Sequence, residues 1–209
     1  MIISAGQFAI LGIAAFALTG LLTWPVRALA IRLGAMDAPN LARKTQATPV
    51  PYLGGVAIAL GITITTFVAV FVGGKKSGEN VSQLKDLALT VLLPALILGV
   101  MGLVDDLRSL PPWPRLITQS LVGSIVAFII VQGGTVGTPF GTSTLNTAVT
   151  IFWIVGICNS INFFDNLDGA ASGAVAIITL GVFVIAFDRG QELISALTIV
   201  TAGATIGFL

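Results

Sequence analysis

Long apolar runs alternate with short polar connections along the whole chain. A membrane span needs about 20 apolar residues, and charge-free stretches of suitable length occupy residues 1–26, 45–74, 87–104, 116–164, 169–187 and 193–209. The fourth stretch is long enough for two helices, with a turn from Gln132-Gly133-Gly134 to Gly141-Thr142 between them. The pattern therefore predicts seven transmembrane helices, near residues 3–24, 54–72, 87–104, 116–131, 146–161, 170–187 and 193–209.

Glycine and proline positions refine this picture. Gly54, Gly55 and Gly61 should let neighbouring helices approach closely. Pro94 is expected to kink the third span. The run Pro111-Pro112-Trp113-Pro114 cannot be helical throughout, so it should turn the chain at the membrane surface.

Composition supports an integral membrane protein. The chain of 209 residues is 56% hydrophobic and 9% charged, whereas soluble domains carry about 25% charged residues. A net charge of +1 argues against a nucleic-acid partner. The single cysteine, Cys158, excludes an internal disulfide and is expected to be a small buried apolar residue. We predict an all-α, polytopic transmembrane helical bundle that forms a single domain over residues 1–209.

The two ends of the chain carry further expectations. The first apolar run is too long for a signal-peptide core and no basic residue precedes it, which predicts a retained helix. The last run reaches Leu209 without the polar or charged anchor that usually follows a final span, so we expect a longer native protein. Connections after odd-numbered spans hold six basic residues and those after even-numbered spans hold four. This bias predicts that the odd-numbered connections are cytoplasmic.

Two of the acidic residues, Asp105 and Asp106, end the third span in GLVDDLRSLPP. Carboxylates are costly near hydrocarbon, so their placement indicates a cation or a phosphate to be handled there. An adjacent pair can hold Mg²⁺ together with substrate phosphates, or one carboxylate can act as a base that the other orients. The alternative is a pair that only caps and solvates a loop.

A second polar cluster, Asn159, Asn162, Asp165, Asn166 and Asp168, follows the fifth span and is closed by Gly169. Asn159 and Asn162 are three residues apart and would share a helix face. Amide and carboxylate groups at a helix exit suit the donors of a nucleoside, sugar hydroxyls or a hydrated metal. An ordinary turn with Asp168 as a helix N-cap is the alternative.

The third candidate is the segment PNLARKTQATPVPYLGG, residues 39–55. Lys44 in this segment could neutralise a diphosphate as a point charge, although a loop anchored by the positive-inside rule would look similar. Lys44, the aspartate pair and the second cluster all fall on odd-numbered connections. We therefore expect them on one face of the membrane, where they could form one site.

In their order along the chain, three motifs resemble those of the polyprenyl-phosphate N-acetylhexosamine-1-phosphate transferase superfamily. They are Lys44 with Pro51-x-x-Gly54-Gly55, Gly102-x-x-Asp105-Asp106, and Asn159-x-x-Asn162-x-x-Asp165-x-x-Asp168-Gly169. The resemblance covers roughly residues 39–173, and its motifs are more specific together than singly. Among the subfamilies, the PNLARK and FDNLDG segments are more similar to the bacterial GlcNAc-1-phosphate transferases than to the phospho-N-acetylmuramoyl-pentapeptide transferase.

The resemblance implies a bacterial plasma-membrane enzyme with cytoplasmic active-site loops. It would transfer a sugar 1-phosphate, GlcNAc-1-phosphate first among candidates, from a UDP-sugar to polyprenyl phosphate and release UMP, with Mg²⁺ or alternatively Mn²⁺. It implies catalytic and metal-binding roles for Asp105 and Asp106, with an aspartate acting either as a base or as a covalent nucleophile. It also implies substrate-binding roles for the other site residues, which are Lys44, Asn159, Asn162, Asp165 and Asp168. Members of that family are often dimers, but these residues show no pairing face.

The chain also departs from the family pattern. Gln46 stands where a histidine is usual, and Tyr52 where a basic residue is common. A Gly-Asp-x-Gly-Ser segment that supplies a metal ligand, and a later histidine-rich loop, are both missing from a chain that contains no histidine. We therefore predict that residues 1–209 alone are inactive. Two other classes remain open: a secondary transporter or channel, which would place its ionisable groups near the bilayer midplane, and an inactive truncated remnant.

Overall fold

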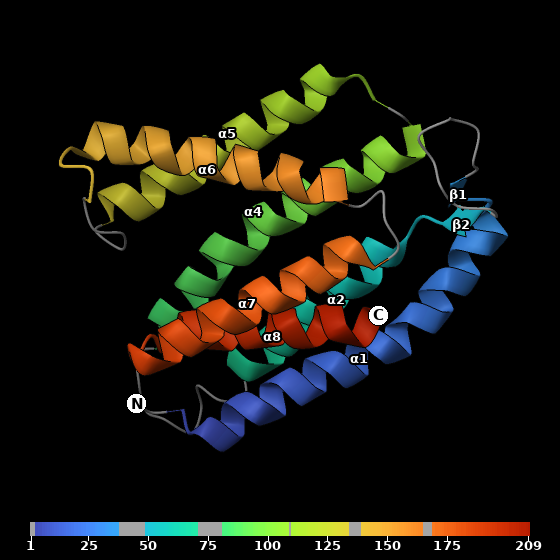
Figure 1. The fold of residues 1–209 in the computed structure, drawn as a ribbon, viewed down its shortest axis with the longest axis horizontal. Helices are drawn as coiled ribbons and strands as arrows, with labels where there is room; N and C mark the ends of the chain where they lie inside the picture. The colour runs from blue at the N-terminus through green and yellow to red at the C-terminus, as the bar shows by residue number, and fades with distance from the viewer. Residues whose placement is uncertain (1–2, 38–48, 71–80, 109, 134–138, 165–168) are drawn as a thin grey trace. The chain divides into compact units, whose positions relative to one another are not determined.

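The computed structural model describes residues 3–37, 49–70, 81–108, 110–133, 139–164 and 169–209, without the side chains of residues 81–88. Over these residues the chain forms helices and one short hairpin (Figure 1): α1 Ala5–Leu33, β1 Met36–Asp37, β2 Val50–Pro51, α2 Gly54–Val68, α4 Val81–Arg108, α5 Pro112–Gln132, α6 Ser143–Phe164, α7 Ala170–Asp188 and α8 Glu192–Phe208. The predicted all-α class is confirmed. Within the described residues, five helices are long and apolar enough to cross a membrane, whereas α2 and α8 are shorter.

Helix α1 is longer than the sequence predicted. The apolar run ends at Trp24, but the helix continues through Pro25 and stops only before Gly34, which has a left-handed φ of 68°. Neighbouring groups can satisfy the backbone that a proline frees in a membrane helix. Hydropathy marks where charge begins, whereas the helix ends where glycine allows the chain to reverse. At its other end, Ser4 and Gln7 form a capping box.

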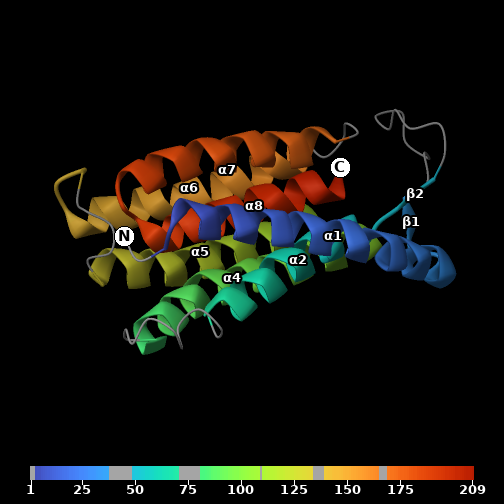
Figure 2. The same cartoon turned by 90° about the horizontal axis from the view of Figure 1, so that it is seen from below.

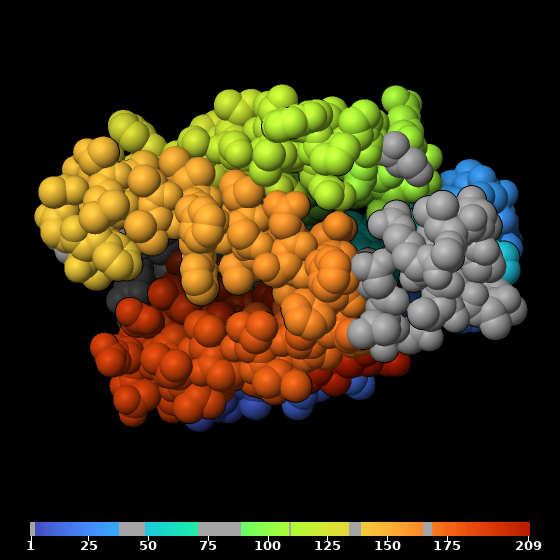
Figure 3. All heavy atoms as spheres, turned by 45° about the horizontal axis from the view of Figure 1, so that its top comes forward, coloured from blue at the N-terminus to red at the C-terminus, as the bar shows by residue number. Residues whose placement is uncertain are grey.

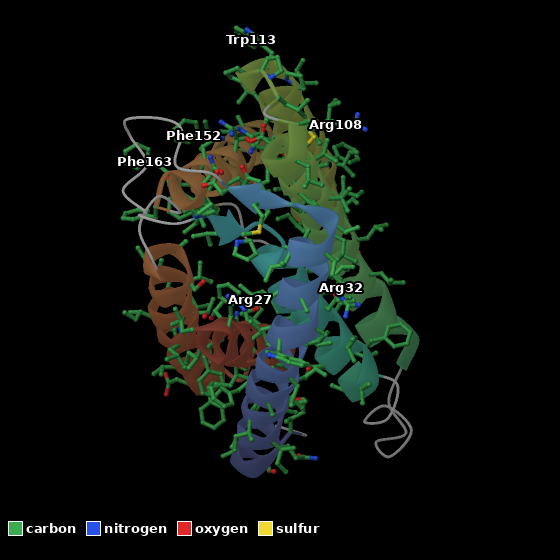
Figure 4. All side chains as sticks on the ribbon, turned by 90° about the vertical axis from the view of Figure 1, so that its right-hand side faces the viewer. Arg27, Arg32, Arg108, Trp113, Phe152 and Phe163 are labelled. Carbon is green, nitrogen blue, oxygen red and sulfur yellow. The ribbon has the colours of Figure 1, made fainter. Side chains whose placement is uncertain are left out.

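The proline run begins helix α5 earlier than the predicted residue 116. Pro111 is extended, with φ −57° and ψ 156°, and α5 starts at Pro112. Proline is tolerated in a first helical turn because its missing N–H would have no intrahelical acceptor there. Trp113 projects from the start of α5 and is 70% exposed (Figure 4). An exposed tryptophan at a helix end suits the membrane surface, where the sequence placed this turn.

The chain divides into two compact units, residues 1–88 with 166–209 and residues 89–165. In the first unit, α8 contacts α1, α2 and α7 and lies among them in two perpendicular views (Figures 1 and 2). Its core consists of Ala15, Val200 and Ala204, with Leu11, Ile58 and Ile62 packed against them. The small core residues keep the helices close, so this unit is held largely by backbone proximity and dispersion.

Glycines set the closest helix approaches in this unit. A Cβ added at Gly203 of α8 would collide with the carbonyl group of Gly12 on α1. Gly61 lies against the side chain of Thr19 and Gly54 against the ring of Phe208, as the sequence predicted for both glycines. For Gly55 the close approach stays a prediction, because an added Cβ would meet no atom of the described residues within 4 Å.

In the second unit, α5 packs against α6 through one stripe of its surface. Buried residues recur every fourth position on α5, at Gln119, Gly123, Ala127 and Val131, and this spacing keeps side chains on one helix face. A Cβ added at Gly123 would lie 3.5 Å from Cγ2 of Ile154 on α6. Large apolar side chains of α6, Phe152 among them, are exposed and suit contact with lipid. The surface of α6 is visible in the space-filling view (Figure 3).

Two predictions about single residues have mixed outcomes. Cys158 on α6 carries a free thiol, as expected, but it is half-buried and not fully enclosed. Helix α4 continues without interruption through Pro94, and the expected kink stays a prediction. The glycine-rich turn between the fourth and fifth spans is confirmed at its described ends, Gln132-Gly133 and Gly141, which has φ 86°.

Candidate active site

The two adjacent aspartates at the end of α4 have different surroundings. Asp105 is half-buried, with 16% of its side chain exposed, and its Oδ2 lies 2.9 Å from Nη1 of Arg115. Asp106, one residue further along the helix, is exposed. Successive helix positions point about 100° apart, so a pair of acids at a helix end naturally presents one inward and one outward carboxylate.

Arg115 reaches Asp105 because the connection between α4 and α5 is short. Arg108 ends α4 and Pro112 begins α5, which brings the first turn of α5 to the last turn of α4. The Arg115 side chain is 28% exposed. A partly exposed pair of this kind is worth at most about 1 kcal/mol in stability, so its main effect is to orient the carboxylate and to compensate its charge.

Asn159 on α6 is oriented by the same face of α5. Its Nδ2 donates a 2.6 Å hydrogen bond to Oε1 of Gln119 and a 2.8 Å hydrogen bond to the carbonyl oxygen of Val155. A backbone carbonyl only accepts hydrogen bonds, so the atom of Asn159 that faces it must be the amide nitrogen. Gln119 must then present its oxygen to that nitrogen. Both amide orientations therefore follow from hydrogen-bond chemistry.

Arg115 and Gln119 belong to one line of residues on α5. They are four apart, so Arg115 continues the line of the buried stripe one turn beyond Gln119, toward the end of α5 that follows Pro111. Side chains at this spacing lie about 5–6 Å apart at Cβ. Asp105 and Asn159, from two different sequence motifs, are thus each bound to α5 within one helical turn.

Of the remaining residues of the proposed site, the structure describes only Asn162. Asn162, near the end of α6, is exposed. Lys44, Asp165 and Asp168 lie outside the described residues. The expectation that all three motifs converge on one site stays a prediction.

The hairpin β1–β2 frames the segment that contains Lys44. Met36 pairs with Pro51 and Asp37 with Val50 in antiparallel register. The Tyr52 hydroxyl donates a 2.8 Å hydrogen bond to Oδ1 of Asp37. The hairpin was not predicted from the sequence, in which Tyr52 stood out only as a departure from the family pattern. In the structure, Tyr52 links the residue after β2 to β1.

The donor set at the end of α4 fits a magnesium ion in part. Mg²⁺ is usually bound by one or two carboxylates with substrate phosphates and water. One oxygen of Asp105 and the exposed carboxylate of Asp106 could serve, while Arg115 occupies the other Asp105 oxygen. Within the described residues, no group of three or more His, Cys, Asp or Glu residues could hold a metal ion. Any further ligand would have to come from substrate, from water or from residues outside this part of the chain.

Two residues at this site were not singled out from the sequence. Arg115 was counted only among the basic residues of a connection, and Gln119 lies inside an apolar run. A polar residue four positions after an arginine, at the start of a buried stripe, was the available signal. Using this signal requires knowing which face of α5 meets α6, and hydropathy alone does not give the rotation of α5 about its axis.

Fold and site together define a multi-pass helical membrane protein with paired carboxylates and an oriented amide at helix ends. The sequence model of glycosyl transferase family 4 matches residues 88–209. The chain belongs to this family.

Several curated relatives support the assignment. The chain is 32% identical over 198 residues to the probable undecaprenyl-phosphate N-acetylglucosaminyl 1-phosphate transferase of Bacillus subtilis (strain 168). The matched region covers 92% of this chain and 52% of the relative. It is 30% identical over 218 residues to the decaprenyl-phosphate N-acetylglucosaminephosphotransferase of Mycobacterium tuberculosis (strain CDC 1551 / Oshkosh), covering 97% of the chain and 53% of the relative.

A third relative is named for a different transferred group. The phospho-N-acetylmuramoyl-pentapeptide-transferase of Streptococcus thermophilus (strain CNRZ 1066) is 33% identical over 132 residues, 56% of the chain and 39% of the relative. The chain thus spans about half the length, or less, of these curated relatives. No solved structure matches it.

Proposed function

We propose that the chain is part of an enzyme that transfers a sugar 1-phosphate, GlcNAc-1-phosphate in the first instance, from a UDP-sugar to polyprenyl phosphate. An oxygen of the lipid phosphate bonds to the sugar-bearing phosphorus of the UDP-sugar. The bond from that phosphorus to the bridging oxygen breaks, and UMP leaves. The preference for GlcNAc is supported by relatives named for that sugar, which match nearly the whole chain.

The observation that carries the proposal is the carboxylate pair at the end of α4, with Asp105 held by Arg115 and Asp106 exposed. Phosphoryl transfer requires positioning and the neutralisation of spread negative charge. Asp105 and Asp106 would hold Mg²⁺, or Mn²⁺ in its place, which would supply that neutralisation. A lipid phosphate presents its head group at the membrane surface. The exposed Trp113 supports a position of the start of α5 at that surface.

The other site residues complete the proposed assignment. Lys44 would compensate the diphosphate charge, and Asn159 and Asn162 would hydrogen-bond the nucleotide sugar. Asp165 and Asp168 would order the same region. The site would open to the cytoplasm, where UDP-sugars are available, and residues 1–209 alone would be inactive because they lack the histidine-rich loop and the Gly-Asp-x-Gly-Ser segment of the family pattern.

The test is UMP release from UDP-GlcNAc in the presence of undecaprenyl phosphate. The chain would be produced in membranes together with any sequence that continues it in its gene, and residues 1–209 would be assayed beside it. Asp105→Asn and Asp106→Asn should each lower the rate about 100-fold or more, while Asp188→Asn, at the end of α7, should not. Unchanged activity in both aspartate variants would refute the assigned roles.

A further inference from the structure

We propose that Arg115 and Gln119, at the polar end of the α5 stripe, are positioning residues of this site. This inference rests on the proposed function. Arg115 fixes the carboxylate of Asp105, and Gln119 fixes the amide of Asn159, so a single helix face aligns groups from α4 and α6. Neither residue would need to touch the reacting atoms.

The Gln119 contact has a directional consequence. Both hydrogen bonds that the structure shows for the Asn159 amide use Nδ2. Within the part of the chain that the structure describes, no donor reaches its Oδ1, so this oxygen could accept a hydrogen bond from a ligand, such as a hydroxyl or N–H group of the nucleotide sugar. If Gln119 lost its acceptor oxygen, Nδ2 would keep only the Val155 carbonyl, and the amide could rotate away from this orientation.

Burial makes the Gln119 contact more than a surface interaction. Gln119 is 7% exposed, and buried polar groups are costly unless they are hydrogen-bonded. A polar residue in an otherwise small and apolar stripe sets the rotation of α5 against α6, because only one rotation pairs it. The same rotation directs Arg115, one turn away, toward Asp105.

Arg115 acts on Asp105 through geometry and charge. Two adjacent carboxylates repel each other, and a guanidinium bonded to one of them compensates part of that repulsion. Lysine at this position would keep the charge without the planar fork of arginine. Lysine is therefore expected to preserve part of the effect, and an uncharged side chain of similar length to preserve none.

The test is steady-state kinetics of UMP release by the full protein in membranes, with UDP-GlcNAc varied. Gln119→Leu should raise KM for UDP-GlcNAc about tenfold, with kcat within about twofold, as expected for the loss of one oriented hydrogen bond. Arg115→Met should lower kcat about tenfold or more with little change in KM, and Arg115→Lys should recover part of that loss. Thr118→Val is the matched control, because among the described residues the Thr118 hydroxyl shows one hydrogen bond, to the Pro114 carbonyl of its own helix. It should leave both constants unchanged.

A double-mutant comparison separates positioning from a general loss of packing. If Gln119 acts through Asn159, the KM of Gln119→Leu/Asn159→Ala should equal that of Asn159→Ala alone. Multiplied effects, or a Gln119→Leu variant that behaves like Thr118→Val, would overturn the inference while leaving the proposed function intact. Absence of UMP release from the wild-type protein would instead refute the proposed function, and the positioning roles with it.

Discussion

The hydroxyl of Tyr52 donates a hydrogen bond of 2.8 Å to Oδ1 of Asp37, across the hairpin that joins the end of α1 to the start of α2. The two residues are 15 positions apart in the chain, and the segment between them contains Arg43 and Lys44. A contact between the flanks of a loop restricts the conformations that the loop can adopt. Tyr52 therefore connects local hairpin stability to the placement of a proposed phosphate-binding lysine.

Replacing Tyr52 with phenylalanine should loosen this loop without disturbing the helices. The ring is retained and the hydrogen bond to Asp37, worth about 1 kcal/mol, is lost, so tryptic cleavage after Arg43 and Lys44 should become several-fold faster. Cleavage after Arg189, in the turn between α7 and α8, provides an internal control and should be unchanged. Equal rates in Tyr52→Phe and wild type at residues 43 and 44 would mean that the hydrogen bond does not restrain the loop.

The contact between Gly203 and Gly12 predicts a strong size limit at the interface of α1 and α8. Gly203→Ala would drive a methyl group into the Gly12 carbonyl, and forced overpacking of this kind typically costs about 1–3 kcal/mol. The variant should therefore unfold at a lower temperature in detergent, as measured by a thermal shift assay.

Gly181→Ala on α7 is the control for that substitution. An added Cβ at Gly181 meets no atom of the described residues within 4 Å, and alanine favours a helix over glycine by about 0.5–1 kcal/mol. This variant should be as stable as the wild type or slightly more stable. A Gly203→Ala protein as stable as Gly181→Ala would contradict the close packing of α1 and α8.

Metal removal tests the part of the proposal that depends on Asp105 and Asp106. Treatment with EDTA should abolish UMP release, and added Mg²⁺ or Mn²⁺ should restore it, because carboxylate oxygens favour these hard cations. Phosphate compounds bound in the site would contribute further ligands. Full activity after exhaustive chelation would exclude an essential divalent ion.

Side-specific labelling tests the orientation of the helices and the rival transport function. Cys158 is the only cysteine, so a Cys158→Ala background allows single cysteines to be introduced at Arg108 and Arg189. An impermeant maleimide should label position 189 in intact cells and position 108 only in inverted vesicles. The reverse pattern would overturn the cytoplasmic assignment. Protection of position 108 from both sides would favour a midplane site, as expected of a transporter.

The apolar runs of the sequence determined the all-α membrane class, the approximate positions of the helices and the candidate acids at their ends. This succeeded because the bilayer requires long stretches free of charge, which hydropathy registers directly. Helix ends were less predictable. Helix α1 continues through Pro25 to Leu33, and α5 begins at Pro112, because backbone geometry and capping decide a terminus.

Only the tertiary structure decided which side chains meet. Three side-chain contacts each depend on the rotation of a helix or on the register of a hairpin. They join Asp105 to Arg115, Gln119 to Asn159 and Asp37 to Tyr52. Residues 40 positions apart, such as Gln119 and Asn159, carry no local sign of their pairing. Rotation is set by packing of the whole α5 stripe against α6, and this packing is a collective property of many small contacts.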